Sequence, residues 1–205
     1  RAVHYCKTSL EKYDYVVKKR TKINNRLLLF NISYYNIIRL IKRGIAYMQD
    51  PNAWRNDQEY LNIVDDLLQH KEVQQLSQYT QHHFSNRLRH SISVSYQSYI
   101  IAKKIGADAT ATARAGLLHD MFYYDWRVTK FEEGSHAYVH PRVALKNAQK
   151  ITHINSKEAD IILKHMFGAT IALPKYRESW IVSIVDDFAA VNEYLVPKAY
   201  LSYFK

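Results

Sequence analysis

Residues 113–120 read Ala113-Arg-Ala-Gly-Leu-Leu-His119-Asp120, a run of small and apolar residues that ends in an adjacent histidine and aspartate. The run fits a helix, and Asp108 is placed to cap its start. An ionised carboxylate among apolar neighbours is costly unless it is paired or coordinates a cation. Imidazole and carboxylate together suit Fe, Mn, Co, Ni or Zn. The pair is therefore a candidate metal-binding element at the end of an apolar helix.

Four further residues extend this pair into an ordered set. Each lies inside or at the end of a different expected helix, among apolar neighbours: His90 in Arg87-Leu-Arg-His90, His140 before Pro141, His165 in Leu163-Lys-His165, and Asp186 in Val185-Asp186-Asp187. Taken singly, each histidine is more often a hydrogen-bonded structural residue than a ligand. Their ordered recurrence across about a hundred residues favours a shared metal site.

Beyond the first fifty residues the chain has a helical pattern. Apolar residues recur at spacings of three and four, which indicates amphipathic helices. Gly106 marks a helix end, Pro141 suits a first helical position, and Asn155 with Glu158 resembles a capping pair. The sequence has no alternating strand run with hairpin signals and no internal repeat. We therefore predict an all-α fold.

The charge of the chain is unevenly distributed. Of 205 residues, 29 are Lys or Arg and 19 are Asp or Glu, a net charge of +10. Residues 1–50 hold 11 basic and 3 acidic residues, whereas residues 51–205 hold 18 and 16. We predict a basic helical N-terminal extension, 1–50, and a nearly neutral domain, 51–205. A net positive charge suggests a nucleic-acid partner, but the excess of basic residues lies in 1–50, outside the domain, which argues against one.

The N-terminal extension has the pattern of a basic amphipathic helix. Phe30, Tyr34, Ile38 and Ile41 recur at helical spacing, and basic residues fall on the other side. Polar residues interrupt the apolar stretch too early for a transmembrane helix. We favour a helix that packs its apolar face on the main domain. The alternative is a peripheral membrane or protein contact through residues 15–48.

The single cysteine, Cys6, excludes an internal disulfide framework and fits a reducing compartment. We therefore expect a cytoplasmic protein. A chain of 205 residues buries enough surface to fold without a structural metal or disulfide. A metal site in it would consequently serve function rather than folding.

From about Asp50 to Leu195 the chain resembles the HD-domain metal-dependent phosphohydrolases. Five segments carry the resemblance: Arg87-x-x-His90-Ser91, Ala113-Arg-Ala-Gly-Leu-Leu-His119-Asp120, His140-Pro141, Ile162-Leu-Lys-His165-Met166 and Val185-Asp186. The chain is similar in particular to small bacterial members in which a His-Met segment precedes a run such as Pro174-Lys-Tyr-Arg-Glu-Ser-Trp180. The fold that this resemblance implies is an HD-domain helical bundle.

The resemblance also implies a role for each residue of the set. Four side chains would hold a first metal: His90, His119, Asp120 and Asp186. His140 and His165 match the extra histidines of two-metal members, in which the aspartate of the pair bridges both ions. Met166 stands where some of those members have a further histidine. We expect one or two divalent transition-metal ions, of which Fe, Mn, Co, Ni and Zn are candidates.

The activity implied is hydrolysis of a small phosphate ester, most simply a nucleotide, by attack of a metal-bound hydroxide. Asp120 would be catalytic through the metals. Arg87, one helical turn before His90, would either bind the substrate phosphate or pair with a carboxylate behind the metal. The alternative function is a degenerate HD module that binds a nucleotide for signalling. The Gly-Tyr-Pro signature of the cyclic-dinucleotide phosphodiesterase branch is absent.

The segment after the His-Asp pair contains Tyr123, Tyr124 and Trp126 and is expected to form a loop over the site. Its aromatic rings would stack on a nucleobase or simply pack in the core. His136, which follows Gly134 in the same expected loop, is an alternative ligand.

Overall fold

The computed structural model describes residues 52–81 and 85–195. Within these ranges the chain forms seven α-helices and two 3₁₀ helices, and no strand. In chain order they are η3 (Ala53–Asn56), α3 (Gln58–Leu68), α4 (Lys71–Gln74), η4 (Gln75–Gln78), α5 (Arg87–Lys104), α6 (Ala109–Leu118), α7 (His136–Ile151), α8 (Ser156–Lys164) and α9 (Arg177–Leu195). The predicted all-α class is confirmed. The predicted extension, 1–50, lies outside the described residues.

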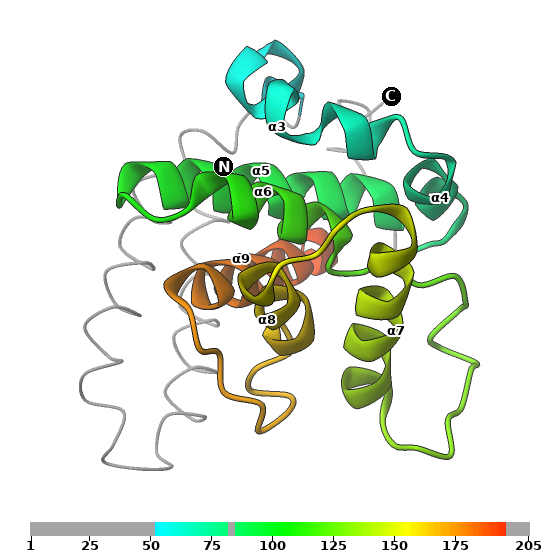
Figure 1. Ribbon diagram of the computed structural model, residues 1–205. Helices are drawn as coiled ribbons and strands as arrows, with labels where there is room; N and C mark the ends of the chain where they lie inside the picture. Colours follow the sequence, from blue (N-terminus) through cyan, green and yellow to red (C-terminus); the bar gives the residue numbers. More distant parts are fainter. Residues whose placement is uncertain (1–51, 82–84, 196–205) are drawn as a thin grey trace.

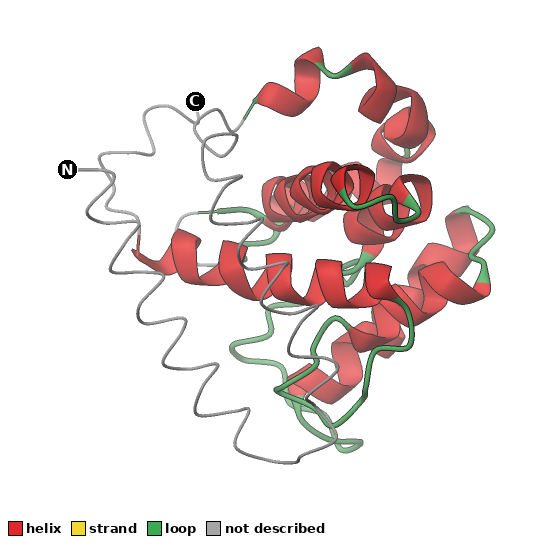
Figure 2. Ribbon diagram, turned by 90° about the vertical axis from the view of Figure 1, so that its left-hand side faces the viewer, coloured by secondary structure: helices red, strands yellow, loops and turns green. Residues whose placement is uncertain are grey.

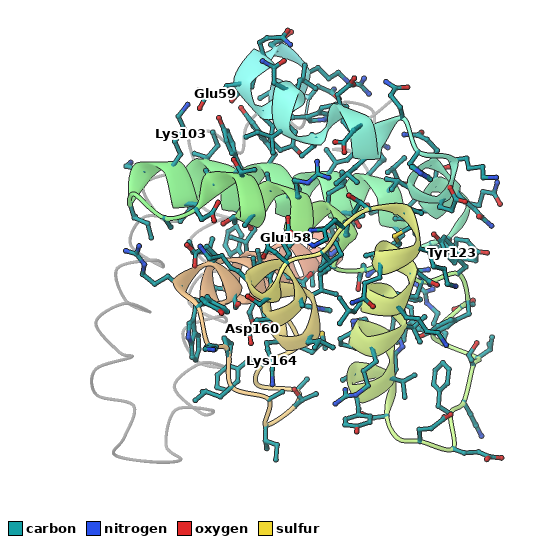
Figure 3. All side chains as sticks on the ribbon, in the orientation of Figure 1. Glu59, Lys103, Tyr123, Glu158, Asp160 and Lys164 are labelled. Atoms are coloured by element: carbon teal, nitrogen blue, oxygen red, sulfur yellow. The ribbon has the colours of Figure 1, made fainter. Side chains whose placement is uncertain are left out.

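Helices α5 and α6 lie side by side at the centre of the described fold (Figure 1). Helix α3 lies on one side of this pair, and α8 and α9 lie on the other. Helix α7 packs on α8 and α6 at one end of the bundle, and Figure 2 shows the same layers after a quarter turn. On the surface, Lys103 of α5 pairs with Glu59 of α3 (Figure 3). No helix in the described ranges is long and apolar enough to cross a membrane.

One serine in the core connects three of these helices. The buried Ser95 hydroxyl of α5 donates to the carbonyl of Ala113 in α6 at 2.7 Å and accepts from the Tyr60 hydroxyl of α3 at 2.8 Å. At the same place α6 has Gly116, where a Cβ atom would lie 3.0 Å from the Cα of Ser95. Glycine therefore lets the backbones of α5 and α6 come close enough for these hydrogen bonds.

Three helix boundaries agree with the sequence prediction. Asp108 caps α6 by accepting from the backbone N–H of Ala111 at 2.9 Å. Asn155 and Glu158 form a reciprocal capping box at the start of α8. Gly106 adopts a φ of 64° just beyond α5, a conformation that glycine takes without strain. These short-range signals place the end of α5 and the starts of α6 and α8. The C-terminal ends of α6 and α8 lead directly into the candidate site.

Helix α7 begins earlier than the sequence predicts. The sequence places Pro141 at the first helical position, but the helix begins at His136 and Pro141 lies inside it. Proline cannot donate to the carbonyl four residues earlier. The helix nevertheless continues, because His140 and Pro141 are buried against the bundle and tertiary packing overrides local propensity. His136 is thus a helical residue, one turn from His140, and not a loop residue.

Candidate metal centre

The six residues of the sequence set converge at one place in the bundle. His90 lies in the first turn of α5, and His119 and Asp120 directly follow α6. The other three come from different elements: His140 from α7, His165 just after α8, and Asp186 from α9. Three groups bring ligand atoms within 4.8 Å of one another: His90 with His119 and Asp120, His119 with His165 and Asp186, and Asp120 with His140 and His165.

Asp186 is the centre of one half of this site. Its Oδ1 atom lies 2.8 Å from Nε2 of His90 and 3.5 Å from Nε2 of His119. Both histidines are fully buried. Burial disfavours the ionised form of Asp186, but the adjacent imidazoles of His119 and His90 outweigh it and hold the pKa of the carboxyl below its usual range. Asp186 is therefore a carboxylate at neutral pH.

Asp120 is the centre of the other half. Its Oδ1 atom lies 3.2 Å from Nε2 of His140 and 3.7 Å from Nε2 of His165, while Oδ2 lies 3.7 Å from Nε2 of His119. Burial opposes its ionisation, but the neighbouring imidazoles, His119 first, hold the pKa of Asp120 well below its usual range. Asp120 thus lies between both groups of histidines, the position required of a bridging carboxylate.

Backbone carbonyls fix the orientation of three of the imidazoles. Nδ1 of His119 lies 2.7 Å from the Gly116 carbonyl, and Nδ1 of His165 lies 2.7 Å from the Ile162 carbonyl. Nδ1 of His140 lies 2.8 Å from the carbonyl of His136. Since a carbonyl can only accept, each Nδ1 carries a proton and each Nε2 turns toward the carboxylates. This is the usual second contact of a metal-binding histidine.

Two details of the Nε2 atoms fit a cation. Nε2 of His119 is buried and makes no hydrogen bond. Nε2 of His140 lies 2.8 Å from Nε2 of His165, although the protons of both rings are committed at Nδ1. Burial, together with His140 and His119, lowers the pKa of His165 to about 3, so this ring is neutral at pH 7. A divalent ion held by such lone pairs would satisfy them, and the donor set of imidazoles and carboxylates suits a transition metal.

Glu193 is a member of the site that the sequence interpretation missed. Its Oε1 atom lies 3.1 Å from Nδ1 of His90, on the side of the ring opposite Asp186. Burial disfavours the charged form of His90, but Glu193 and Asp186 outweigh it and raise its pKa well above the usual value. A signal was available, because Asp186 and Glu193 are seven positions apart and so share a helix face.

Arg87 is buried against the loop that follows Asp120. Its side chain is fully buried, with the guanidinium 3.5 Å from the centre of the Phe122 ring. It donates to the carbonyls of Phe122 at 2.6 Å and Tyr124 at 3.3 Å, and to Oε1 of Gln81 at 2.8 Å. These contacts place the guanidinium beside Gln81 and the loop that follows Asp120.

The loop between α6 and α7 packs its aromatic residues beside the site. His136, in the first turn of α7, stacks on the ring of His140 with centroids 4.3 Å apart. Trp126 of the loop stacks on His136 in turn, with centroids 5.6 Å apart. Tyr123 reaches away from the centre and donates to the Glu72 carbonyl at 3.1 Å (Figure 3). Burial lowers the pKa of His136 to about 4, with a smaller contribution from the neighbouring His140. His136 supports His140 and belongs to none of the three potential metal-binding groups.

Comparison with known proteins agrees with this geometry. The family model of the HD domain matches residues 87–191, about half of the chain. Ribonuclease Y of Oceanobacillus iheyensis is 34% identical over 99 residues, which are 45% of this chain and 18% of that protein. Ribonuclease Y of Clostridium kluyveri is 37% identical over 71 residues, 35% of this chain and 13% of that protein. The chain thus spans less than a fifth of these relatives, and no solved structure gives a significant match.

Proposed function

Because this chain belongs to the HD-domain family, we propose that its buried histidines and aspartates hold one or two divalent transition-metal ions and that it hydrolyses a nucleotide phosphate ester. One observation carries the proposal. Asp120 stands between His119 on one side and the facing pair of His140 and His165 on the other. A carboxylate in this position can bind two ions at once, and two ions are the usual means of cleaving a phosphate ester in such a site.

The ions would supply an activated water molecule and neutralise charge on the phosphate. The protein's own residues hold the ligands in place. Two carboxylates kept ionised, Asp120 and Asp186, offset the positive charge, and the carbonyl-bound rings of His119, His140 and His165 present Nε2 lone pairs. Because each histidine is fixed by a second contact, little reorganisation is needed when the ions bind.

The substrate class is inferred from two sources. The relatives carry the name ribonuclease, which supports a phosphate ester within a nucleotide or ribonucleotide. The imidazole and carboxylate donors are suited to phosphate-ester hydrolysis by a metal-bound hydroxide. A small nucleotide is the proposal, and an RNA oligonucleotide is the natural comparison substrate.

The experiment combines metal analysis with a substrate panel. The purified protein should contain at least one transition-metal ion per chain and hydrolyse bis-p-nitrophenyl phosphate or a nucleotide. Asp120→Ala should lose both metal and turnover, whereas Asp65→Ala, on the exposed face of α3, should keep both. A fully metallated protein without turnover on any mononucleotide, phosphodiester or RNA oligonucleotide would refute hydrolysis and favour a nucleotide-binding module.

A further inference from the structure

Gln81 connects the buried Arg87 to the carboxylate of Asp120. Its Oε1 accepts from Nε of Arg87 at 2.8 Å, and its Nε2 donates to Oδ2 of Asp120. All three side chains are buried. Among the described residues, the Gln81 amide therefore links the permanent positive charge of Arg87 to the proposed bridging carboxylate of Asp120.

The orientation of this amide is fixed by its two neighbours. The guanidinium of Arg87 can only donate, so it requires the carbonyl oxygen of Gln81. An ionised Asp120 can only accept, so it requires the amide nitrogen. A flipped amide would face a donor with a donor and an acceptor with an acceptor. The two hydrogen bonds therefore support one another.

The backbone of Gln81 is held as firmly as its side chain. Its N–H donates to the Ser85 carbonyl at 2.8 Å. Its carbonyl accepts from the guanidinium of Arg127 at 3.0 Å and from the indole of Trp126 at 3.4 Å. Both donors come from the loop that follows Asp120. The amide is thus anchored independently of any contact with Asp120.

Arg87 also fixes the chain immediately after Asp120. Its two terminal nitrogens donate to the carbonyls of Phe122 and Tyr124, and its guanidinium stacks on the Phe122 ring. Burying a guanidinium is costly unless its donors are satisfied. Here the guanidinium donates to the Gln81 amide, which contacts the Asp120 side chain, and to two carbonyls of the chain that follows Asp120. The buried cation therefore supports both the side chain and the backbone at this position.

We propose that Gln81, oriented by Arg87, is the positioning residue of Asp120. By holding Oδ2, the amide leaves Oδ1 directed at His140 and His165, while Oδ2 still faces His119. Loss of this contact frees the carboxylate to rotate and lose one of its two sets of partners. Outer contacts of this kind typically change metal affinity by about 10- to 100-fold. This inference rests on the proposed metal centre.

The test is Co²⁺ titration followed by visible absorption, which reports the ligand field as well as the affinity. Gln81→Met preserves length but removes both hydrogen-bonding groups. We expect about 10- to 100-fold weaker Co²⁺ binding and an altered spectrum. Gln75→Met, at an exposed position of η4, is the matched control and should keep the parent spectrum.

A second variant separates positioning from a merely structural role. Gln81→Glu keeps an oxygen for Arg87 but replaces the donor to Asp120 by a second carboxylate, so the Co²⁺ spectrum should change while the circular dichroism of the helices stays that of the parent. Parent-like spectra and affinities in both Gln81 variants would overturn the inference and leave the metal centre intact. A parent protein that binds no Co²⁺ would instead overturn the proposed metal centre and this inference with it.

Discussion

His140 and His165 face each other across 2.8 Å through their Nε2 atoms, and Nδ1 of each ring donates to a backbone carbonyl. Each carbonyl accepts the proton on Nδ1, which leaves Nε2 as the atom of each ring that can bind a metal ion. Two lone pairs therefore point at the same small volume, next to Oδ1 of Asp120. This pair distinguishes the half of the site around Asp120 from the half around Asp186, and it leads to the first prediction.

His140→Ala and His165→Ala should each remove one metal ion while leaving the other in place. His90 lies in the other half of the site, 2.8 Å from Asp186, and shares no potential metal-binding group with His140 or His165. Elemental analysis should show the metal content of each variant falling by about one ion per chain from a two-ion parent, because binding is lost at one site of two. His153→Ala, an exposed histidine near the start of α8, is the control. Loss of all metal from both variants would contradict two separable sites.

Glu193→Gln should weaken metal binding at the half of the site around Asp186 by about 10-fold, because it removes the charge that orients and polarises His90. Isothermal titration with Mn²⁺ or Co²⁺ measures the change. Glu132→Gln, in the exposed part of the loop before α7, should bind like the parent. An unchanged affinity would mean that Asp186 alone orients His90.

Metal binding should release protons, and its affinity should rise with pH. The pKa values of His90 and His119 are raised, despite burial, by the carboxylates around them, so in the metal-free protein these rings keep their second proton to a higher pH than a free imidazole does. A metal ion binds only the neutral ring and must displace the proton. Raising the pH removes the competing protons and favours the metal.

Calorimetric titrations in two buffers of different ionisation enthalpy measure this proton release. Heats that are independent of the buffer would show that no proton leaves. Such a result would contradict the raised pKa values of the two rings.

Gly116→Ala should destabilise the bundle by about 1–3 kcal/mol, the usual range for overpacking. The new Cβ would lie 3.0 Å from Cα of Ser95, so α5 and α6 would have to separate. Urea denaturation at fixed metal concentration gives the free energy of unfolding. Ala109→Ser, at the first position of α6, changes a half-buried residue on the same helix and should cost much less. Equal stabilities of Gly116→Ala and the parent would show that the bundle accommodates the extra methyl group.

Sequence patterns predicted most of the fold because the signals concerned are local. The caps of α6 and α8 and the glycine after α5 act within a few residues, and each appears as predicted. The start of α7 was the exception. Its first turn is decided by the burial of His140 and Pro141 against other helices, which a local pattern does not contain.

The candidate site divides in the same way. The six histidines and aspartates were identifiable because ionisable residues at the ends of apolar helices need a partner or a cation. Gln81 has no such context and resembles any surface residue, whereas Glu193 has one signal, its spacing of seven residues from Asp186. Gln81 contacts Asp120 across 39 positions, and Arg87 reaches the Tyr124 carbonyl across 37.

The chain therefore carries its helices, their caps and its metal-binding residue types in short-range patterns, since these depend on neighbours within one or two turns. Only the tertiary structure decides which oxygen of Asp120 faces which histidine and which residues orient the ligands. These contacts join side chains from several helices and loops that are far apart in the sequence and meet in one buried volume. Arg87 illustrates the difference: its position one turn before His90 suggests either a phosphate ligand or a partner for a carboxylate, and only the tertiary structure shows its guanidinium against Gln81 and the loop that follows Asp120.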